Sequence, residues 1–303
     1  MARAPTRIDF GGGWTDVPPY PERDGGFVCN VAISRYARVS FVPTAGTSDE
    51  PLARAALSHA GAFGTIAIES EFPTGAGLGG SSAAGVAIQA ALGAFRGEAP
   101  GPDTLAQRSR AVEVDALGIA GGWQDHYAAA YGGALALDFG ETTRATRIPV
   151  ASATLELLER RCLLLHTGQS RISAANITAV LDAYAGGDPR VCAALARMAS
   201  LARSMADALR AGDVAALGES VAEHWVHQRS LHPAITTERI DAIVERAAAA
   251  GALGTKALGA SGGGCVVIIT PDDPTPIARA VESLGTLLPF TVDRQGATVE
   301  EDL

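Results

Sequence analysis

The sequence predicts an α+β protein in two domains, and three observations lead to that fold class. The chain has 303 residues, which is enough for two domains of about 150 residues each. Runs rich in Val, Ile, Phe and Tyr alternate with runs of helical periodicity in both halves. No internal repeat of fixed period is present. We therefore expect one domain over residues 1–150 and a second over residues 151–303.

The first half is expected to place strands around one long helix. An extended segment at 7–10 runs into three glycines, and 27–42 has the composition of one or two strands. A strand at 65–72 leads through a glycine-rich loop into a helix at 83–95. The other elements expected here are a loop at 44–51, a helix at 104–117 capped by Asp103, and a strand at 134–138.

The second half is expected to be mainly helical. It opens with a strand at 162–166, and the predicted helices cover 174–185, 189–211, 214–230 and 236–250. A second glycine-rich loop then feeds an apolar strand at 266–269, and a helix at 276–284 and a strand at 288–292 complete the pattern.

Composition argues against nucleic-acid and membrane partners. The formal net charge is −9, and no basic run of the kind that neutralises phosphates is present. The sequence shows no signal peptide and no run of about eighteen apolar residues. The four cysteines lack zinc-site spacing and disulfide-scaffold density, so we expect reduced thiols. These features predict a soluble, cytoplasmic protein.

The loop at 73–84 has the features of a phosphate-binding site. It reads Pro-Thr-Gly-Ala-Gly-Leu-Gly-Gly-Ser-Ser-Ala-Ala between a predicted strand and a predicted helix. Glycines let an anion approach the main chain, and the free N–H groups and dipole of a helix start favour negative charge. A purely structural turn is the alternative. The candidate phosphate-binding residues are Pro73, Gly75, Gly77, Leu78, Gly79, Gly80, Ser81 and Ser82.

Two familiar nucleotide motifs do not fit this loop. A dinucleotide-binding fold needs a second strand that ends in an acidic residue about twenty positions later, but 86–96 has helical periodicity. No Lys-Ser/Thr pair follows the glycines, so the loop is not of the Walker type. Since Lys256 is the only lysine, phosphate recognition is expected to use arginines, helix ends and a metal ion.

Two other stretches carry candidate site residues. Gly12 and Gly13 permit close approach of a ligand, and Thr15 and Asp16 offer hydroxyl-binding groups, although Asp16 equally suits a cap of the turn before two prolines. Asp125, flanked by glycines and aromatic residues, suits a base in a cleft or a helix N-cap.

Three residues have weaker signals. Glu113 lies on a predicted helix, where a solvated glutamate is common. His224 and His227 have i, i+3 spacing on a helix, but no third metal ligand is evident.

Three motifs, taken together, resemble the signature motifs of the GHMP kinases, a family that includes galactokinase, homoserine kinase and mevalonate kinase. They are the N-terminal Ala4-Pro5-x-Arg7 with Gly12-x-x-Thr15-Asp16, the central loop described above, and Gly259-Ala260-x-Gly262-Gly263-Gly264. The resemblance implies an N-terminal domain of the ribosomal protein S5 domain 2-like type, a ferredoxin-like C-terminal domain, and an active-site cleft between them.

The resemblance also implies roles for single residues. It makes Asp125 the catalytic aspartate, with Arg7 as the basic residue that steadies the phosphoryl group. The central loop would bind the phosphates of ATP, and Ser81 and Glu113 would hold Mg²⁺. Sugar binding would involve Gly12, Gly13, Thr15, Asp16, Arg171, Gly262 and Gly263. Positioning and charge stabilisation of this kind are what phosphoryl transfer requires.

Within the family, the chain is similar to the branch of D-glycero-D-manno-heptose 7-phosphate kinases and L-fucose kinases. The features that carry this similarity include Gly-Gly-Trp-Thr-Asp-Val-Pro-Pro, Trp123-Gln124-Asp125 and Thr-Gly-Gln-Ser-Arg at 167–171. His126 and Ser261 depart from the branch pattern. The resemblance implies a sugar 1-kinase that uses a heptose phosphate, with L-fucose 1-kinase as the alternative. A catalytically silent sugar sensor is the alternative of another class.

Overall fold

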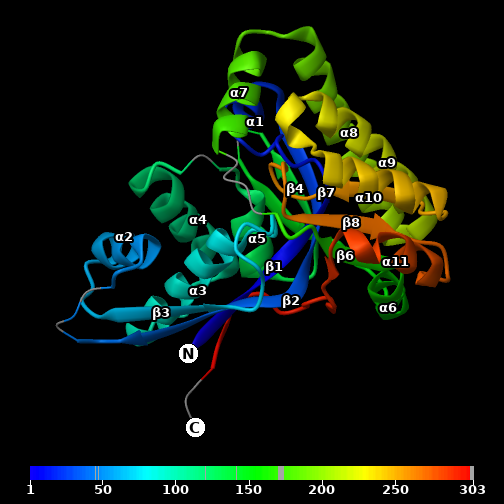
Figure 1. Ribbon diagram of the computed structural model, residues 1–303. Helices are drawn as coiled ribbons and strands as arrows, with labels where there is room; N and C mark the ends of the chain where they lie inside the picture. Colours follow the sequence, from blue (N-terminus) through cyan, green and yellow to red (C-terminus); the bar gives the residue numbers. More distant parts are fainter. Residues whose placement is uncertain (45, 47, 120, 141, 170–173, 301–303) are drawn as a thin grey trace.

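The computed structural model describes residues 1–44, 46, 48–119, 121–140, 142–169 and 174–300. Two antiparallel sheets lie side by side with their helices around them, and the chain ends come together at the first sheet (Figure 1). The predicted mixture of strands and helices is therefore confirmed. Among the described residues, no helix has both the length and the apolar character needed to cross a membrane, and the four cysteines are free thiols.

Six strands of the described residues form the first sheet. Its main path runs β10-β1-β2-β4-β5, and β3 pairs with the far end of β2. The register between β1 and β2 shifts between Asp9 and Gly11, and such an irregularity re-aims side chains near a site. The strands are β1 (Ala2–Gly11), β2 (Gly26–Val42), β3 (Thr65–Ser70), β4 (Ala134–Phe139), β5 (Arg144–Arg147) and β10 (Thr298–Val299).

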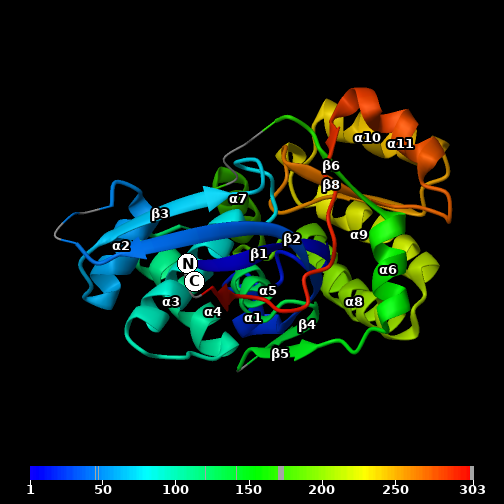
Figure 2. The same ribbon diagram turned by 90° about the horizontal axis from the view of Figure 1, so that it is seen from below.

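Helices cover both faces of this sheet. Apolar side chains of α3, α5 and the sheet share one core, while α8 packs against the opposite face (Figures 1 and 2). Small residues make α3 buried nearly all round, so the helix lies directly on β1 and β2. The helices of this half are α1 (Tyr20–Asp24), α2 (Pro51–Ala60), α3 (Gly80–Phe95), α4 (Pro102–Arg110), the π-helical η1 (Ala111–Ala116) and α5 (Gln124–Tyr131).

The second sheet has the strand order β7-β8-β6-β9. In chain order, helices follow β6 and β8, while β7 leads directly into β8. This is the β-α-β-β-α-β arrangement of ferredoxin-like domains. Its strands are β6 (Cys162–His166), β7 (Gly254–Ala257), β8 (Cys265–Ile269) and β9 (Thr286–Leu287). Its helices are α6 (Ser152–Arg161), α7 (Ala174–Ala185), α8 (Pro189–Ala211), α9 (Val214–Ser230), η2 (Pro233–Ile235), α10 (Glu238–Ala249), α11 (Thr275–Val281) and η3 (Glu282–Leu284).

Several element predictions need correction. The predicted strand at 288–292 is wrong, because its one pairing is an isolated bridge between Ile33 and Val292. Asp103 is not the cap of α4, which begins after Gly101 and passes into η1 instead of continuing to residue 117. The helices α1, α2 and α6 and the strands β5 and β7 were not expected.

Residues 291–299 return to the first sheet. The Ser34 amide donates to the carbonyl of Thr291, and β10 pairs with the start of β1. The division of the chain at residue 150 stays a prediction, but this C-terminal segment pairs with strands of the first sheet.

Candidate active site

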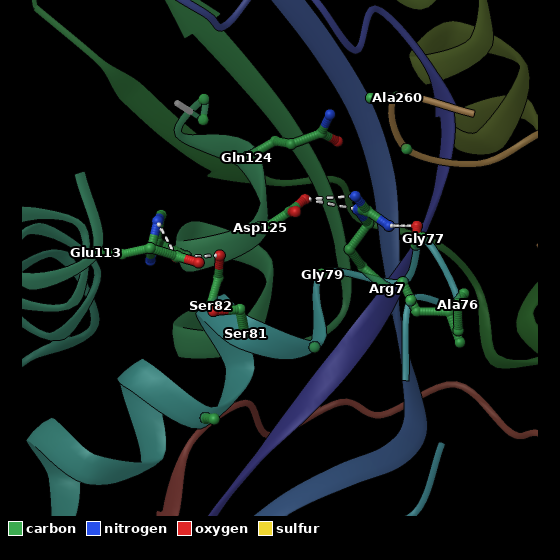
Figure 3. A pocket seen from close by; sticks show the side chains of 18 of the residues that line it. Arg7, Ala76, Gly77, Gly79, Ser81, Ser82, Glu113, Gln124, Asp125 and Ala260 are labelled. Atoms are coloured by element: carbon green, nitrogen blue, oxygen red, sulfur yellow. Dashed lines mark hydrogen bonds and ion pairs between the residues drawn. The ribbon is translucent and has the colours of Figure 1, made fainter. Parts of the chain in front are cut away.

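A cavity of about 610 Å³ lies where the two halves meet. Its wall combines the end of β1 and the turn after it, the loop at 73–82, the start of α5 and the loop at Gly259. A volume of this size suits a small-molecule ligand. The loop at 73–82 and the Asp125 carboxylate, which were predicted to meet, therefore face one cavity (Figure 3).

The loop at 73–82 takes the form expected of an anion cradle. Gly75, Gly77 and Gly79 have φ values of 70°, 72° and 73°, in the left-handed region that favours glycine. Gly79 is the residue before the first turn of α3, and no side chain caps that helix start. The amides at the start of α3 are thus free to receive a ligand, and the 16-residue helix dipole adds to the positive potential there.

The second glycine loop packs directly on the first. The Cys265 amide donates to the carbonyl of Ala76 at 2.8 Å. A Cβ atom on Gly77 would lie 2.7 Å from the carbonyl oxygen of Leu258, so this close approach requires glycine. The loop before β8 is therefore both the hairpin connection between β7 and β8 and a support for the phosphate-binding loop.

Arg7 and Asp125 form an ion pair in the middle of the cavity. Nε and Nη2 of Arg7 both lie 2.7 Å from Oδ1 of Asp125, and Nη1 donates to the carbonyl of Gly77 at 2.6 Å. Figure 3 shows the guanidinium between the carboxylate and the glycine loop. Burial raises the pKa of Asp125, and the Arg7 charge opposes that rise. The carboxylate retains 27% exposure, so it remains open to a ligand.

Glu113 sits at the other side of the cavity in a network of polar groups. Its Oε2 accepts a hydrogen bond from Ser82 Oγ at 2.8 Å and lies 3.2 Å from Nε2 of His126. The second ring nitrogen of His126 lies 2.9 Å from Ser109 Oγ. Burial lowers the pKa of His126 to about 3, so the imidazole is neutral near pH 7. A neutral ring that donates from Nε2 to Glu113 orients this carboxylate.

Glu113 does not lie on a solvated helix face, which was the common alternative for a glutamate on a predicted helix. Its side chain is 10% exposed, and η1 carries it into the cavity. Burial raises the Glu113 pKa, while the hydroxyls of Ser81 and Ser82 oppose the rise. The sequence did not predict that Ser82 and His126 would be the partners of Glu113.

Asp16 links the N-terminal turn to α5. Its Oδ2 accepts hydrogen bonds from the amides of Trp123 and Gln124 at 2.8 and 2.9 Å, at the start of the helix that carries Asp125. Asp16 thus supplies the capping interaction, and Asp125 is not the N-cap. Burial raises the pKa of Asp16 to about 6, partly offset by the Gln124 amide. Its Oδ1 has no hydrogen-bond partner among the described residues.

Three other residues that line the cavity also carry an unpartnered polar atom. Asp9 and Trp14 line the cavity, as does Gln124. Each has one buried polar atom without a hydrogen-bond partner in the described part of the chain: Oδ1 of Asp9, Nε1 of Trp14 and Oε1 of Gln124. Buried polar groups are normally paired, so this concentration indicates a ligand subsite. The sequence had indicated Asp16 here but not these three residues.

The predicted site residues fall into three groups by position. All eight residues predicted for the phosphate loop line the cavity, as do Arg7, Gly13, Asp16, Glu113 and Asp125. Gly12, Thr15, Gly262 and Gly263 are not among its lining residues; Thr15 Oγ1 instead donates to the carbonyl of Gly12, and the Gly262 amide to that of Ile235. Arg171 lies outside the described residues. The ligand contacts of all these residues stay predictions.

The histidines of α9 have structural partners. His224 Nε2 accepts a hydrogen bond from the Gly12 amide at 2.9 Å, and His227 Nε2 lies 3.8 Å from Glu223. No group of three or more His, Cys, Asp or Glu residues is placed to hold a metal ion in the described part of the chain.

Family models match both halves of the chain. The model described as GHMP kinases N terminal domain matches residues 50–133, and the one described as GHMP kinases C terminal matches residues 205–286. A crystal structure of a D-glycero-D-manno-heptose 1-phosphate kinase from Bacteroides thetaiotaomicron has a TM-score of 0.76 at 21% identity and covers 99% of each chain. This likeness shows the fold.

The sequence relatives include two sugar kinases. The chain is 24% identical to a D-glycero-alpha-D-manno-heptose 7-phosphate kinase of Campylobacter jejuni, over 97% of this chain and 96% of the relative. It is 26% identical to an Arabidopsis thaliana bifunctional fucokinase/GDP-fucose pyrophosphorylase, over 88% of this chain. The chain spans 29% of the length of that bifunctional relative. With the two family models matched over residues 50–133 and 205–286 and the fold shared with a solved kinase, the chain belongs to the GHMP kinase family.

Proposed function

We propose that this protein is an ATP- and Mg²⁺-dependent sugar kinase that phosphorylates the anomeric C1 hydroxyl of a heptose 7-phosphate. The observation that carries the proposal is the placement of Asp125 and Arg7 beside the glycine loop at the start of α3. A carboxylate, a guanidinium and an anion cradle in one cavity are the groups that phosphoryl transfer to a hydroxyl needs.

The nucleotide is proposed to occupy the side of the cavity lined by the loop at 73–82. The amides at the start of α3 receive the phosphates. Leu52, Ile68 and Phe72 line the cavity beyond the loop, on α2, on β3 and just after β3. Their apolar side chains offer a surface on which a purine ring packs. The helix α2, absent from the sequence-based prediction, thereby completes the nucleotide subsite.

Mg²⁺ fits the oxygen donors beside this loop. Glu113 and Ser81 would hold the ion, and Ser82 and His126 keep the Glu113 carboxylate in place. One carboxylate and a hydroxyl suit Mg²⁺, which completes its coordination with water and phosphate oxygens. When bound, the ion supplies positive charge next to the transferring phosphate.

Asp125 is proposed to receive the proton of the attacking sugar hydroxyl at its carboxylate. Oδ1 is engaged by Arg7, which leaves Oδ2 for the hydroxyl. Arg7 opposes the rise that burial causes in the Asp125 pKa and orients the carboxylate, and its guanidinium stabilises the charge that builds up on the phosphoryl oxygens. Asp16 and its unpartnered neighbours lie where the sugar ring would be held.

The choice of sugar rests on similarity. The heptose 7-phosphate kinase matches over nearly its whole length, which favours the heptose phosphate. The fucokinase match covers most of this chain at slightly higher identity, so L-fucose is the second candidate. A catalytically silent sensor is disfavoured because Arg7, Glu113 and Asp125 are all present and converge on one cavity.

The test is ADP release in the presence of ATP and Mg²⁺ with D-glycero-D-manno-heptose 7-phosphate, L-fucose, D-mannose and D-galactose. We expect turnover with the heptose phosphate and a new anomeric phosphate signal in the ³¹P spectrum of the product. Turnover with L-fucose alone would make L-fucose the substrate and would leave the proposed sugar 1-kinase reaction unchanged. ATP binding without turnover of any sugar would contradict the kinase proposal and favour the sensor.

A further inference from the structure

A buried ion pair stands behind the proposed sugar subsite. Lys256, the only lysine of the chain, lies on β7 with a fully buried side chain. Its Nζ donates to the main-chain carbonyl of Asp9 at 2.9 Å and lies 3.1 Å from Oδ2 of the same residue. The pair joins the two sheets, because Asp9 belongs to β1. Burying a charged pair is costly, and a role in specificity is one reason for which such pairs are retained.

The other oxygen of Asp9 has no such partner. Asp9 is 2% exposed and lines the cavity, and its Oδ1 receives no hydrogen bond from the described residues. Since Lys256 occupies Oδ2, the carboxylate cannot turn freely, and Oδ1 is left buried without a partner among the described residues. An unpaired buried carboxylate oxygen is expensive, so a hydrogen-bond donor on the ligand would relieve a large cost.

Three neighbours give the same wall a defined chemistry. We call Asp9, Trp14, Asp16 and Gln124 the hydroxyl wall. Its unpartnered atoms are the oxygens Oδ1 of Asp9, Oδ1 of Asp16 and Oε1 of Gln124, with one donor, Nε1 of Trp14. Hydrogen-bond acceptors therefore dominate, and a ligand that faces them must present O–H or N–H groups.

The charges at this wall exclude an anionic group. Of the described residues that line the cavity, Arg7 alone carries a fixed positive charge, and its N–H groups are directed to Asp125 and Gly77. Lys256 is committed to Asp9. A phosphate placed beside Asp9 and Asp16 would meet like charges without a free cation to offset them.

We propose that Asp9, held in place by Lys256, binds a neutral hydroxyl of the sugar other than the one that is phosphorylated. Asp9 is then a specificity-determining residue and Lys256 a positioning residue. The sugar turns free hydroxyls toward the hydroxyl wall, and any phosphate it already carries points away from it. This inference rests on the proposed function, because it assumes that a sugar occupies this end of the cavity.

The experiment combines one substitution with the removal of single hydroxyls. Wild-type protein and Asp9→Asn are assayed by ADP release with D-glycero-D-manno-heptose 7-phosphate, with L-fucose, and with the monodeoxy analogues of each. Because Lys256 can only donate, it selects the amide oxygen of the asparagine and leaves an NH₂ group where Oδ1 stood. An acceptor facing the sugar thereby becomes a donor.

In the wild type, loss of one hydroxyl other than the anomeric one is expected to lower kcat/KM by about 10- to 100-fold, the value of a hydrogen bond to a buried charged group. In Asp9→Asn, KM for the intact sugar rises by a similar factor with kcat nearly unchanged. Removal of that same hydroxyl from the sugar then lowers kcat/KM of the variant by less than about threefold. Penalties at the other hydroxyls stay as in the wild type.

Asp293→Asn is the matched control. Asp293 is also buried and accepts hydrogen bonds, from Tyr36 and Gly296 among others, but it is not among the residues that line the cavity. Its substitution should leave the pattern of hydroxyl penalties unchanged. If Asp9→Asn does not fold, the double variant Asp9→Leu/Lys256→Met removes both charges and the acceptor oxygens, and it is expected to lose the same single penalty.

Hydroxyl penalties that agree between wild type and the Asp9 variants at every position would overturn the proposal, even if Tm falls, because a merely structural pair alters stability and not selectivity. If neither sugar is phosphorylated, the proposed function fails separately. Calorimetric binding of the same sugars and analogues then tests Asp9 directly: binding weakened by loss of one hydroxyl only in the wild type supports the inference, and equal weakening in both proteins overturns it.

Discussion

Substitution of Gly79 by alanine tests whether the glycine loop and the catalytic carboxylate act as one unit. A Cβ atom at Gly79 would lie 2.8 Å from Cγ and 3.0 Å from Cβ of Asp125, closer than carbon atoms approach in folded proteins. The loop is anchored to the second glycine loop, so the Asp125 side chain must move and its contact with Arg7 must change. A displacement of about 1 Å at a reacting group costs on the order of 10²-fold in rate.

The alanine also meets a backbone penalty, because φ at Gly79 is 73°. This strain costs roughly 1–2 kcal/mol. Gly97, just beyond the other end of α3, is the matched control: φ is 70°, and nothing lies within 4 Å of its added Cβ. Both variants should lose the backbone strain in urea unfolding, and Gly79→Ala should lose more because of its contact with Asp125. Only Gly79→Ala should lose about 10²-fold in kcat by ADP release. Equal kcat values for the two variants, measured where both are folded, would show that the loop and Asp125 do not act as one unit.

Two further predictions concern the other carboxylates. Glu113→Gln should raise the Mg²⁺ concentration for half-maximal activity about tenfold or more, because an amide is a weaker ligand than a carboxylate; an unchanged Mg²⁺ titration would remove Glu113 from metal binding. Burial raises the pKa of Asp16 from 3.8 to about 6. Between these pH values the folded protein keeps the Asp16 proton and the unfolded chain releases it. The contribution of Asp16 to the free energy of unfolding therefore falls as pH rises from 4 to 7. Asp16→Asn, which does not titrate, should gain on the order of 3 kcal/mol relative to wild type over that range, from two pKa units at about 1.4 kcal/mol each. Urea unfolding at pH 4 and pH 7 measures it, and a difference that does not change with pH would contradict the assigned environment.

The loop at 73–82 and Asp125 could be predicted from sequence because their signals are local. Glycines at alternate positions before a helix indicate an anion site without knowledge of the fold. Of the hydroxyl wall, only Asp16 had a signal in the sequence. Asp9 and Lys256 are 247 positions apart in the chain, and only the packing of the second sheet against the first brings them together.

The secondary structure that was missed has separate physical causes. Helix α2 carried the usual signals, with Pro51 in its first turn, Glu50 capping it and Gly61 after its end, but the polar residues before it suggested a loop. The change from α4 to η1 has no propensity signal, because tertiary contacts decide it. That change carries Glu113 inward, to Ser82 and His126.

The substitution Asp125→Asn tests whether Asp125 accepts the proton of the attacking hydroxyl. We expect kcat to fall by about 10²- to 10⁴-fold, the usual contribution of a general base, while calorimetry gives a Kd for ATP within about threefold of wild type. A kcat within a few-fold of wild type would remove Asp125 from the role of general base, because the remaining groups of the cavity would then suffice for transfer without this carboxylate.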